Sequence, residues 1–561
     1  MPLAVSDPAL AEKHRALLDG ARAAIRERTF WSAFPEHLAL YGEDGAAAGK
    51  AAFEACLGRE FPLDQPGADG TAGGERSPYG PELRIRYPHS ATDALLAAAA
   101  AAIPAWRDAG ADARTGACIE ILVRLNERSH ELAHAVMHTT GQGYPMAFQA
   151  GGPHAQDRGL EAIAYAWEEM SRHAPAAVWE KPQGKRPPLR LRKSFRIAPR
   201  GVALVIGCST FPIWNAYPGL FASLVTGNAV VVKPSPRAVL PLALTVAVAR
   251  EVLEAAGFDP NLVTLAVDAD GERRAAELAL RPEVRLIDYT GSSAFGEWLE
   301  RNAAQAVVFA EKAGVNSAVL DSTDDYDGML ANLAFTLSLY SGQMCTTTQN
   351  LIVPRGGIET DKGHRSFDEV GADLAAAIDR LLAEPPRAAA ILGAISSDEI
   401  LARAERAGEL GRLIRPSAPV EHPDFPGAAV RTPALVAVDG AADGPHLEEQ
   451  FGPVAFLVAV DDTAAALLLL RETSARRGAI TAAVWSTDEA VLAEAERAAL
   501  EAGVALSENL AGGVYVNQSA AFSDFHATAA NPAASASLTD GAFVAPRFHV
   551  VQSRRPLEEE A

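Results

Sequence analysis

The chain has 561 residues, of which 48% are hydrophobic, and a formal net charge of −21. The length suggests roughly two to four domains, and the acidic balance argues against nucleic acid or an anionic membrane as a partner. The four cysteines form no CxxC pair and no cluster with histidine, so we expect no disulfide scaffold and no metal site. The N-terminus lacks the pattern of a signal peptide, so the expected location is cytoplasmic.

The N-terminal part of the chain is predicted to be helical. Apolar residues at helical spacing predict a helix over 8–30, and the Gly- and Pro-rich segment 60–82 is typical of a linker. Further helices are expected over 91–105, 114–139 and 157–173. No residue of this part indicates a chemical function.

A basic segment follows at 181–200. It carries eight Lys or Arg residues and no acid, with apolar residues interleaved as in a two-stranded ribbon. A run of charged residues usually forms a face exposed to solvent, so we expect an exposed hairpin here. Such a hairpin could lie at a subunit contact. The alternative is a binding site for an anionic substrate.

From Gly201 onward strands alternate with helices, which predicts a parallel, doubly wound α/β sheet. Its strands are expected at 202–206, 229–233, 262–267 and 286–289. The helices between them are expected over 214–226, 240–256 and 273–280. The apolar stretch 202–232 contains Gly, Pro and Asn, so we expect no membrane span there. Ligands of such sheets bind at the carboxyl ends of the strands.

A second α/β stretch is predicted over 307–516. Its strands are expected at 318–320, 351–353, 454–460, 479–485 and 513–517. A small, polar tail covers 520–541, and 542–553 is predicted to be a closing strand.

Four short motifs carry the possible chemistry. The first is Gly342-Gln343-Met344-Cys345, which places a thiol on a turn before a β-rich run. A deprotonated thiol is a strong nucleophile, whereas a lone cysteine is often a small core residue. The other three are Gly291-Ser292-x-x-x-Gly296 after a strand, Phe309-Ala310-Glu311-Lys312-Ala313-Gly314, and Glu449-Gln450-Phe451-Gly452-Pro453.

In this order and spacing, the four motifs resemble those of the aldehyde dehydrogenase superfamily over residues 85–555. The resemblance implies an α/β fold with a Rossmann-type cofactor-binding domain, an α/β catalytic domain and a small β oligomerisation element. The domain boundaries that follow are 1–82 for an N-terminal extension and linker, 83–180 and 201–310 for dinucleotide binding, 181–200 and 518–556 for a bridging element, and 311–517 for catalysis.

The resemblance also implies a role for each motif residue. Cys345 would attack the aldehyde carbon, and Glu311 would activate water to hydrolyse the resulting thioester. The cofactor, NADP or NAD, would meet residues at the ends of strands and in the fourth motif. These are Lys233 at the adenosine ribose, Gly291, Ser292 and Gly296 at the pyrophosphate, and Glu449 and Phe451 at the nicotinamide ribose.

Three departures from the family pattern matter. Thr210 stands where an asparagine usually donates to the oxyanion, and Asn215, inside the following helix, is not given that role. Pro236 and Arg237 replace a usual ribose-binding glutamate, which favours NADP, because Arg pairs well with phosphate. Lys312 follows Glu311 directly and would either lower the pKa of that carboxyl or point to solvent.

The expected reaction is NAD(P)-dependent oxidation of an aldehyde to an acid by a homodimer or homotetramer. The length, the N-terminal extension and the tail most resemble superfamily members of phenylacetate degradation, which implies a ring-opened semialdehyde carried on CoA. One alternative is a CoA-acylating dehydrogenase, against which Glu311 argues. The other is a catalytically impaired scaffold, for which Thr210 and the altered segment 312–315 are the only support.

Overall fold

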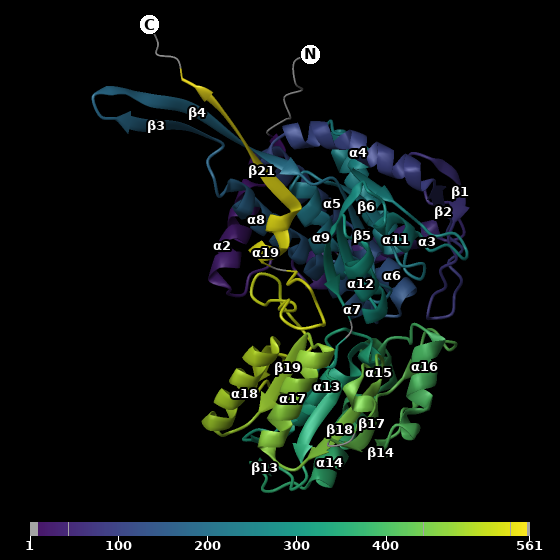
Figure 1. Ribbon diagram of the computed structural model, residues 1–561. Helices are drawn as coiled ribbons and strands as arrows, with labels where there is room; N and C mark the ends of the chain where they lie inside the picture. Colours follow the sequence, from purple (N-terminus) through teal and green to yellow (C-terminus); the bar gives the residue numbers. More distant parts are fainter. Residues whose placement is uncertain (1–8, 43, 313, 441–442, 539, 558–561) are drawn as a thin grey trace.

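Two α/β lobes, each built on a mainly parallel sheet, make up most of the chain (Figure 1). The computed structural model describes residues 9–557 except 43, 313, 441, 442 and 539. Within this described part, no helix is long and apolar enough to cross a membrane.

The N-terminal region is helical, as expected, with two breaks. The helix predicted over 8–30 is divided at His14, whose Nε2 lies 2.6 Å from Glu120 Oε2, and residue 8 lies outside the described residues. The helix predicted over 114–139 is divided at Arg128. The elements are α1 (Ala9–Lys13), α2 (Arg15–Glu27), α3 (Gly45–Cys56), β1 (Ala68–Ala72), β2 (Tyr87–Ser90), α4 (Thr92–Asp108), α5 (Ala111–Glu127), α6 (Ser129–Thr140), α7 (Tyr144–Gly151) and α8 (Pro153–Ser171).

The upper lobe contains a five-stranded parallel sheet in the order β7-β6-β5-β8-β9. These strands are β5 (Val202–Ile206), β6 (Ala229–Lys233), β7 (Val263–Leu265), β8 (Val284–Thr290) and β9 (Val307–Glu311). The helices between them are α9 (Pro212–Val225), α10 (Leu240–Ala255), α11 (Arg274–Ala279) and α12 (Ser293–Asn302). β5 and β6 are fully buried runs made almost entirely of Val, Leu, Ile and Ala, which is why their positions could be predicted.

The lower lobe contains a seven-stranded sheet in the order β14-β17-β18-β12-β10-β19-β20, with only β14 antiparallel. Its strands are β10 (Ser317–Leu320), β12 (Asn350–Pro354), β14 (Arg412–Arg415), β17 (Ala434–Asp439), β18 (Val454–Val460), β19 (Thr481–Trp485) and β20 (Ala505–Glu508). Its helices are α13 (Tyr326–Ser338), α14 (Phe367–Leu381), α15 (Pro385–Leu392), α16 (Asp398–Glu405), α17 (Thr463–Arg477) and α18 (Glu489–Ala502). Short strand pairs complete it: β11 (Ser322–Thr323) with β13 (Glu359–Thr360), and β15 (Pro419–Val420) with β16 (Val430–Arg431).

The strand predicted at 513–517 is wrong. The edge strand is β20, which begins just after α18 and pairs in parallel with β19. Gly503, with a φ of 65°, reverses the chain between that helix and β20. Residues 513–517 form turns instead, and Val514 is exposed, because its apolar side chain has no sheet face to cover.

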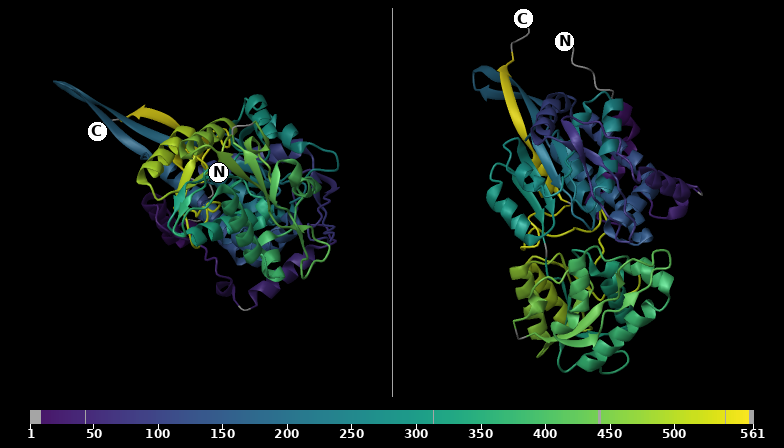
Figure 2. Two further views of the ribbon diagram at one scale, coloured as in Figure 1. Left: turned by 90° about the horizontal axis from the view of Figure 1, so that it is seen from below. Right: turned by 90° about the vertical axis from the view of Figure 1, so that its right-hand side faces the viewer.

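The basic segment forms a long exposed ribbon, as predicted. It consists of β3 (Ala176–Gln183) and β4 (Arg186–Pro199), and β21 (Phe548–Pro556) pairs along the other edge of β4. Figures 1 and 2 show this three-stranded sheet projecting away from the upper lobe. Its apolar side chains Val178, Trp179 and Val551 are exposed.

A buried ion pair ties the C-terminal segment to the upper lobe. The guanidinium of Arg547, which is fully buried, contacts Asp288 on β8 at 2.6 and 2.8 Å and lies over the rings of Phe309 and Phe543. The short helix α19 (Gly541–Val544) precedes it, where the sequence predicted the beginning of a strand. Between the lobes, the tail before α19 runs as an irregular segment (Figure 2).

We expect Asp288→Ala to lower the free energy of unfolding by about 3–5 kcal/mol, because it leaves the buried Arg547 charge without a partner. Urea or thermal unfolding measures the change. The control is Glu501→Gln, which breaks the exposed pair with Arg471 and should cost less than about 1 kcal/mol. Equal effects of the two substitutions would contradict the anchoring role of Arg547.

Candidate active site

The segment before Cys345 is a strained turn fixed by hydrogen bonds. Tyr340 and Ser341, between α13 and Cys345, have φ values of 52° and 49°, a region that residues with a Cβ rarely adopt. The Tyr340 hydroxyl donates to the carbonyl of Thr140 at 2.5 Å, and the Ser341 hydroxyl donates to the carbonyl of Leu392 at 3.0 Å. These bonds to distant segments hold the turn that presents Cys345.

Asn316 fixes the turn from the other side. Its Nδ2 donates to the carbonyls of Cys345 at 2.8 Å and Thr347 at 3.0 Å, while its Oδ1 accepts from the backbone N–H of Ile480 at 2.9 Å. One buried amide therefore joins the Cys345 loop to β10 and to the beginning of β19. No sequence motif includes this residue.

The motif at 449–453 packs directly against the motif at 342–345. The N–H of Gly452 donates to the carbonyl of Gly342 at 3.1 Å. Gly342 has a φ of 66°, and a Cβ on it would collide with the carbonyl oxygen of Gly452. Glycine is therefore required at Gly342 both for its backbone angle and for the close approach of the two motifs.

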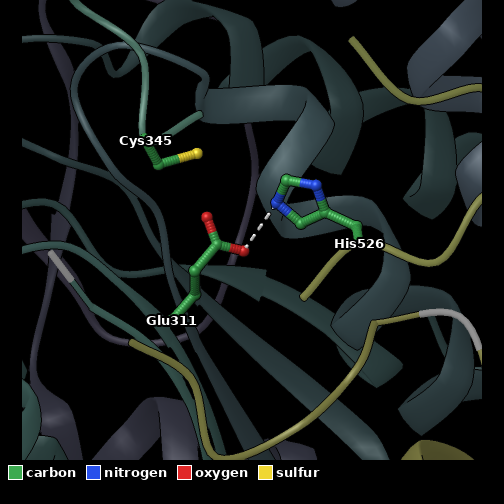
Figure 3. Close-up of side chains that lie close together, drawn as sticks. All are labelled: Glu311, Cys345 and His526. Atoms are coloured by element: carbon green, nitrogen blue, oxygen red, sulfur yellow. Dashed lines mark ion pairs between the residues drawn. The ribbon is translucent and has the colours of Figure 1, made fainter. Parts of the chain in front are cut away.

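Three ionisable side chains from distant segments meet beside this turn (Figure 3). Glu311 stands at the end of β9, Cys345 on the loop before β12, and His526 in the tail between the lobes. Their polar atoms lie within 4.8 Å of one another. Glu311 Oε2 and His526 Nε2 form an ion pair of 3.0 Å, and their side chains are 1% and 3% exposed.

The surroundings shift the pKa values of Glu311 and Cys345 in opposite directions. Burial alone would raise the pKa of Glu311, but the charge of His526 and hydrogen bonds from His526, Cys345 and Asn215 lower it below its ordinary value. Burial, and then the neighbouring Glu311 carboxylate, raise the pKa of Cys345 well above that of an ordinary thiol. In this state the carboxylate is charged and the thiol keeps its proton, so the pair is arranged for proton transfer from sulfur to oxygen.

Asn215, rather than Thr210, faces the cluster. Its Nδ2 donates to Glu311 Oε1 at 3.3 Å, and its Oδ1 lies 3.7 Å from the sulfur of Cys208. The hydroxyl of Thr210 bonds to the sulfur of Cys208 instead, and its carbonyl accepts from Gln142 at 2.7 Å. Because Asn215 was expected to lie inside a helix, the sequence offered no reason to assign it a role. The first turn of α9 directs its side chain at the Glu311 carboxylate.

Lys312 does not act on Glu311. Its Nζ lies 3.0 Å from Glu300 on α12, and its backbone N–H donates to the carbonyl of Ala533 at 2.6 Å. The basic side chain that faces Glu311 is therefore His526, and Lys312 forms its salt bridge with Glu300 instead.

The residues predicted for the dinucleotide lie at the carboxyl edge of the five-stranded sheet. Lys233 ends β6, where it forms an ion pair with Asp268. Ser292 precedes the first turn of α12, between Gly291 and Gly296, and its side chain caps no N–H of that helix. Arg237 is exposed in the turn after β6.

The residues of the motif at 449–453 lie nearer to Cys345. Burial raises the pKa of Glu449 to about 7, although the carboxyl accepts the N–H of Gly314, and its charge contributes to the raised pKa of Cys345. Phe451 is half-buried, and its carbonyl accepts from Arg403. A free helix N-terminus, a lysine and a carboxylate are the groups that pyrophosphate and ribose hydroxyls require, so these residues fit a nicotinamide dinucleotide.

Comparison with known proteins agrees with this arrangement. Residues 86–527 match the aldehyde dehydrogenase family. A crystal structure of an NAD-dependent aldehyde dehydrogenase from Burkholderia multivorans superimposes with a TM-score of 0.97 at 55% identity, covering 98% of this chain and 100% of that one. A 1-pyrroline-5-carboxylate dehydrogenase has the same fold, with a TM-score of 0.73 at 20% identity over 94% of this chain and 99% of that one.

Curated relatives are more distant in sequence. N-succinylglutamate 5-semialdehyde dehydrogenase of Cronobacter sakazakii is 27% identical over 71% of this chain and 77% of its own length. The 2-aminomuconic 6-semialdehyde dehydrogenase of a Pseudomonas species is 28% identical over 52% of this chain and 58% of its own length.

The fold and the matches define an oxidoreductase that acts on aldehydes. The chain belongs to the aldehyde dehydrogenase family. The family and the fold expected from the sequence are thereby confirmed.

We expect Glu311→Gln to speed alkylation of Cys345 by iodoacetamide several-fold at neutral pH. The substitution removes the carboxylate that opposes the thiolate, so the pKa of Cys345 falls and more of the reactive form is present. Peptide mass spectrometry across a pH series measures the rate at Cys345, with buried Cys118 as the internal reference.

Glu300→Gln is the matched control, because that carboxylate pairs with Lys312 and not with the cluster. It should leave the labelling rate unchanged. Slower labelling in Glu311→Gln would mean that the carboxylate promotes the thiolate instead of opposing it.

Proposed function

We propose that the protein oxidises a semialdehyde to a carboxylic acid, with Cys345 as nucleophile and Glu311 as general base. One observation carries the proposal: a thiol and an ionised carboxylate from different segments share one buried site. As the sulfur adds to the aldehyde carbon, its proton passes to Glu311. The carbon–sulfur bond then holds the substrate for the next step.

The negative oxygen that forms needs hydrogen-bond donors. Asn215 offers its amide, since one Nδ2 hydrogen points to Glu311 and the other remains for the substrate oxygen. We propose the backbone N–H of Cys345 as the second donor. Thr210, whose hydroxyl bonds to Cys208, is the weaker candidate for this role.

The cofactor supplies the hydride acceptor when it is bound. Lys233 and Asp268 would hold the adenosine ribose, residues 291–296 the pyrophosphate, and Glu449 with Phe451 the nicotinamide end. Hydrolysis then falls to Glu311, which first releases to solvent the proton that it took from the thiol. It next takes a proton from water, the water oxygen bonds to the acyl carbon, and the carbon–sulfur bond breaks with Cys345 leaving as thiolate, which regains a proton as the acid product departs. Because Glu311 lies in contact with the cysteine, water rather than CoA is the proposed acceptor.

The substrate proposal rests on relatives and on the shape of the chain. The curated relatives are dehydrogenases of N-succinylglutamate 5-semialdehyde and of 2-aminomuconic 6-semialdehyde. The length, extension and tail resemble the phenylacetic acid degradation protein PaaN, which favours a ring-opened semialdehyde carried on CoA. The exposed ribbon projects away from the body, and Arg190 pairs there with Glu180, so it suits a contact in a homodimer or homotetramer better than it suits CoA phosphates. A monomer mass by light scattering would contradict that contact.

The test is an aldehyde panel with product analysis. It includes a free carboxylate semialdehyde, a CoA-linked semialdehyde and a neutral aldehyde, each with NAD and NADP and with or without free CoA. We expect a free acid as product, no dependence on CoA, and the highest kcat/KM for a semialdehyde. Cys345→Ser should abolish turnover. An acyl-CoA product would support the acylating alternative, and no turnover of any aldehyde by a folded protein would support the scaffold.

We further propose NAD as the better cofactor, in contrast to the preference for NADP predicted from Pro236 and Arg237. The support is Asp268, which lies in an ion pair with Lys233 at the expected ribose position, whereas Arg237 is exposed. The carboxylate would accept ribose hydroxyls and repel a 2′-phosphate. The relative from Burkholderia multivorans is described as NAD-dependent.

Asp268→Asn should raise the affinity for 2′-phospho-AMP relative to AMP about tenfold or more, because a like charge is removed. Calorimetric titration of the protein without its dinucleotide measures both ligands directly. Asp270→Asn, an exposed acid nearby, is the control and should change neither. Stronger binding of 2′-phospho-AMP than of AMP by the unmodified protein would instead favour the NADP preference.

A further inference from the structure

His526 is the one member of the buried cluster that the motifs do not include. Its Nε2 lies 3.0 Å from Glu311 Oε2, and Figure 3 shows its ring beside one carboxylate oxygen while Cys345 lies beyond the other. The sequence offered no reason to select it, since it lies in a small, polar tail.

The position of His526 is fixed on several sides. Its ring meets Trp214 of α9 edge to face, with centroids 4.6 Å apart. Its carbonyl accepts the N–H of Leu538 at 3.4 Å. The chain that follows pairs with β9 beside Glu311, where Ser535 donates to the carbonyl of Ala310 at 2.8 Å and Lys312 donates to that of Ala533. Histidine and glutamate are thus held by segments that are bonded to each other.

Other buried carboxyls of the same protein show what His526 changes. Burial raises the pKa of Glu75 to about 7, although this carboxyl accepts hydrogen bonds from Tyr87 and from two backbone N–H groups. Asp157, bonded to Ser32 and a backbone N–H, also has a pKa raised to about 7 by burial. Hydrogen bonds alone do not keep a buried carboxyl ionised here. Glu311 is buried as deeply and yet has a lowered pKa, and of these three it is the one that forms an ion pair with a histidine, whereas His154 acts on Asp157 only as a lesser charge effect.

We propose that His526 is a positioning residue for the deacylation step, which keeps Glu311 ionised and aimed at the water that hydrolyses the thioester. The proposal rests on the function proposed above. A neutral Glu311 could not accept the proton of water, and the acyl group would stay on Cys345. The groups that face Glu311 are His526 from the tail, Cys345 from its loop, and Asn215 and Cys208 from the region of α9, while the charge of Lys312 goes to Glu300.

The sign of the pH effect follows from these contacts. Without the imidazole, burial dominates and the pKa of Glu311 rises, so the base is lost at a higher pH than before. Activity below that pH falls because the thioester is no longer hydrolysed. Attack by Cys345 also passes the proton of the thiol to Glu311, so formation of the thioester slows over the same pH range.

His526→Gln should move the acidic limb of the kcat profile upward by about one pH unit or more and lower kcat about tenfold at the pH of the original limb. His526→Lys restores a positive charge at the same place, so its acidic limb should return toward that of the unmodified enzyme. Thermal unfolding verifies that each variant is folded.

His14→Gln is the matched control, because His14 is also buried and contacts Glu120 at 2.6 Å, but on the outside of the upper lobe. Its pH profile should not move. An unshifted acidic limb in folded His526→Gln, or a shift that His526→Lys fails to reverse, would overturn the role of His526. Activity retained by Cys345→Ser would instead overturn the proposed function, so the two failures are distinguishable.

Discussion

The site depends on placing a half-buried thiol and a buried carboxylate close together. Two anions cannot share such a site without a large electrostatic cost, so only one of Cys345 and Glu311 is charged at a time. His526 determines which one, because its Nε2 forms an ion pair with the Glu311 carboxylate at 3.0 Å. The carboxylate is the charged partner, and the thiol keeps its proton.

This arrangement has to be built from three distant parts of the chain. The Cys345 loop is held by the amide of Asn316 and by the motif at Gly452. The tail that carries His526 is held by α8, where Arg158 donates to the carbonyl of Asp524 and Glu161 accepts the N–H of Phe522. The N-terminal extension packs on the same tail, since Trp31 meets Phe522 edge to face and Arg28 lies over Phe525. The described part of the extension therefore packs against the tail that carries His526.

Sequence patterns predicted what local periodicity and short motifs can specify. The bounds of buried strands such as 202–206 and 229–233 were predicted to the residue, because short unbroken runs of apolar residues are typical of buried strands. The strand at 513–517 was wrong because apolar residues near Gly512 and Gly513 resembled a strand where the chain turns. The pairing of His526 with Glu311, and of Asn316 with Cys345, arises from contacts between lobes and strands that no local pattern encodes. The ion pair of Lys233 with Asp268 was missed for the same reason.

A protonated resting thiol changes how the nucleophile must be activated. If Cys345 were a permanent thiolate, its charge would raise the pKa of Glu311 and remove the base needed for hydrolysis. Because the thiol stays neutral until an aldehyde arrives, the negative charge moves from Glu311 through sulfur to the substrate oxygen within one step. At rest, the Glu311 carboxylate raises the pKa of Cys345 and so disfavours the thiolate. During attack, the same carboxylate accepts the proton of the thiol. We therefore expect Cys345 at rest to be alkylated slowly and yet to attack an aldehyde efficiently, because Glu311 acts on both processes.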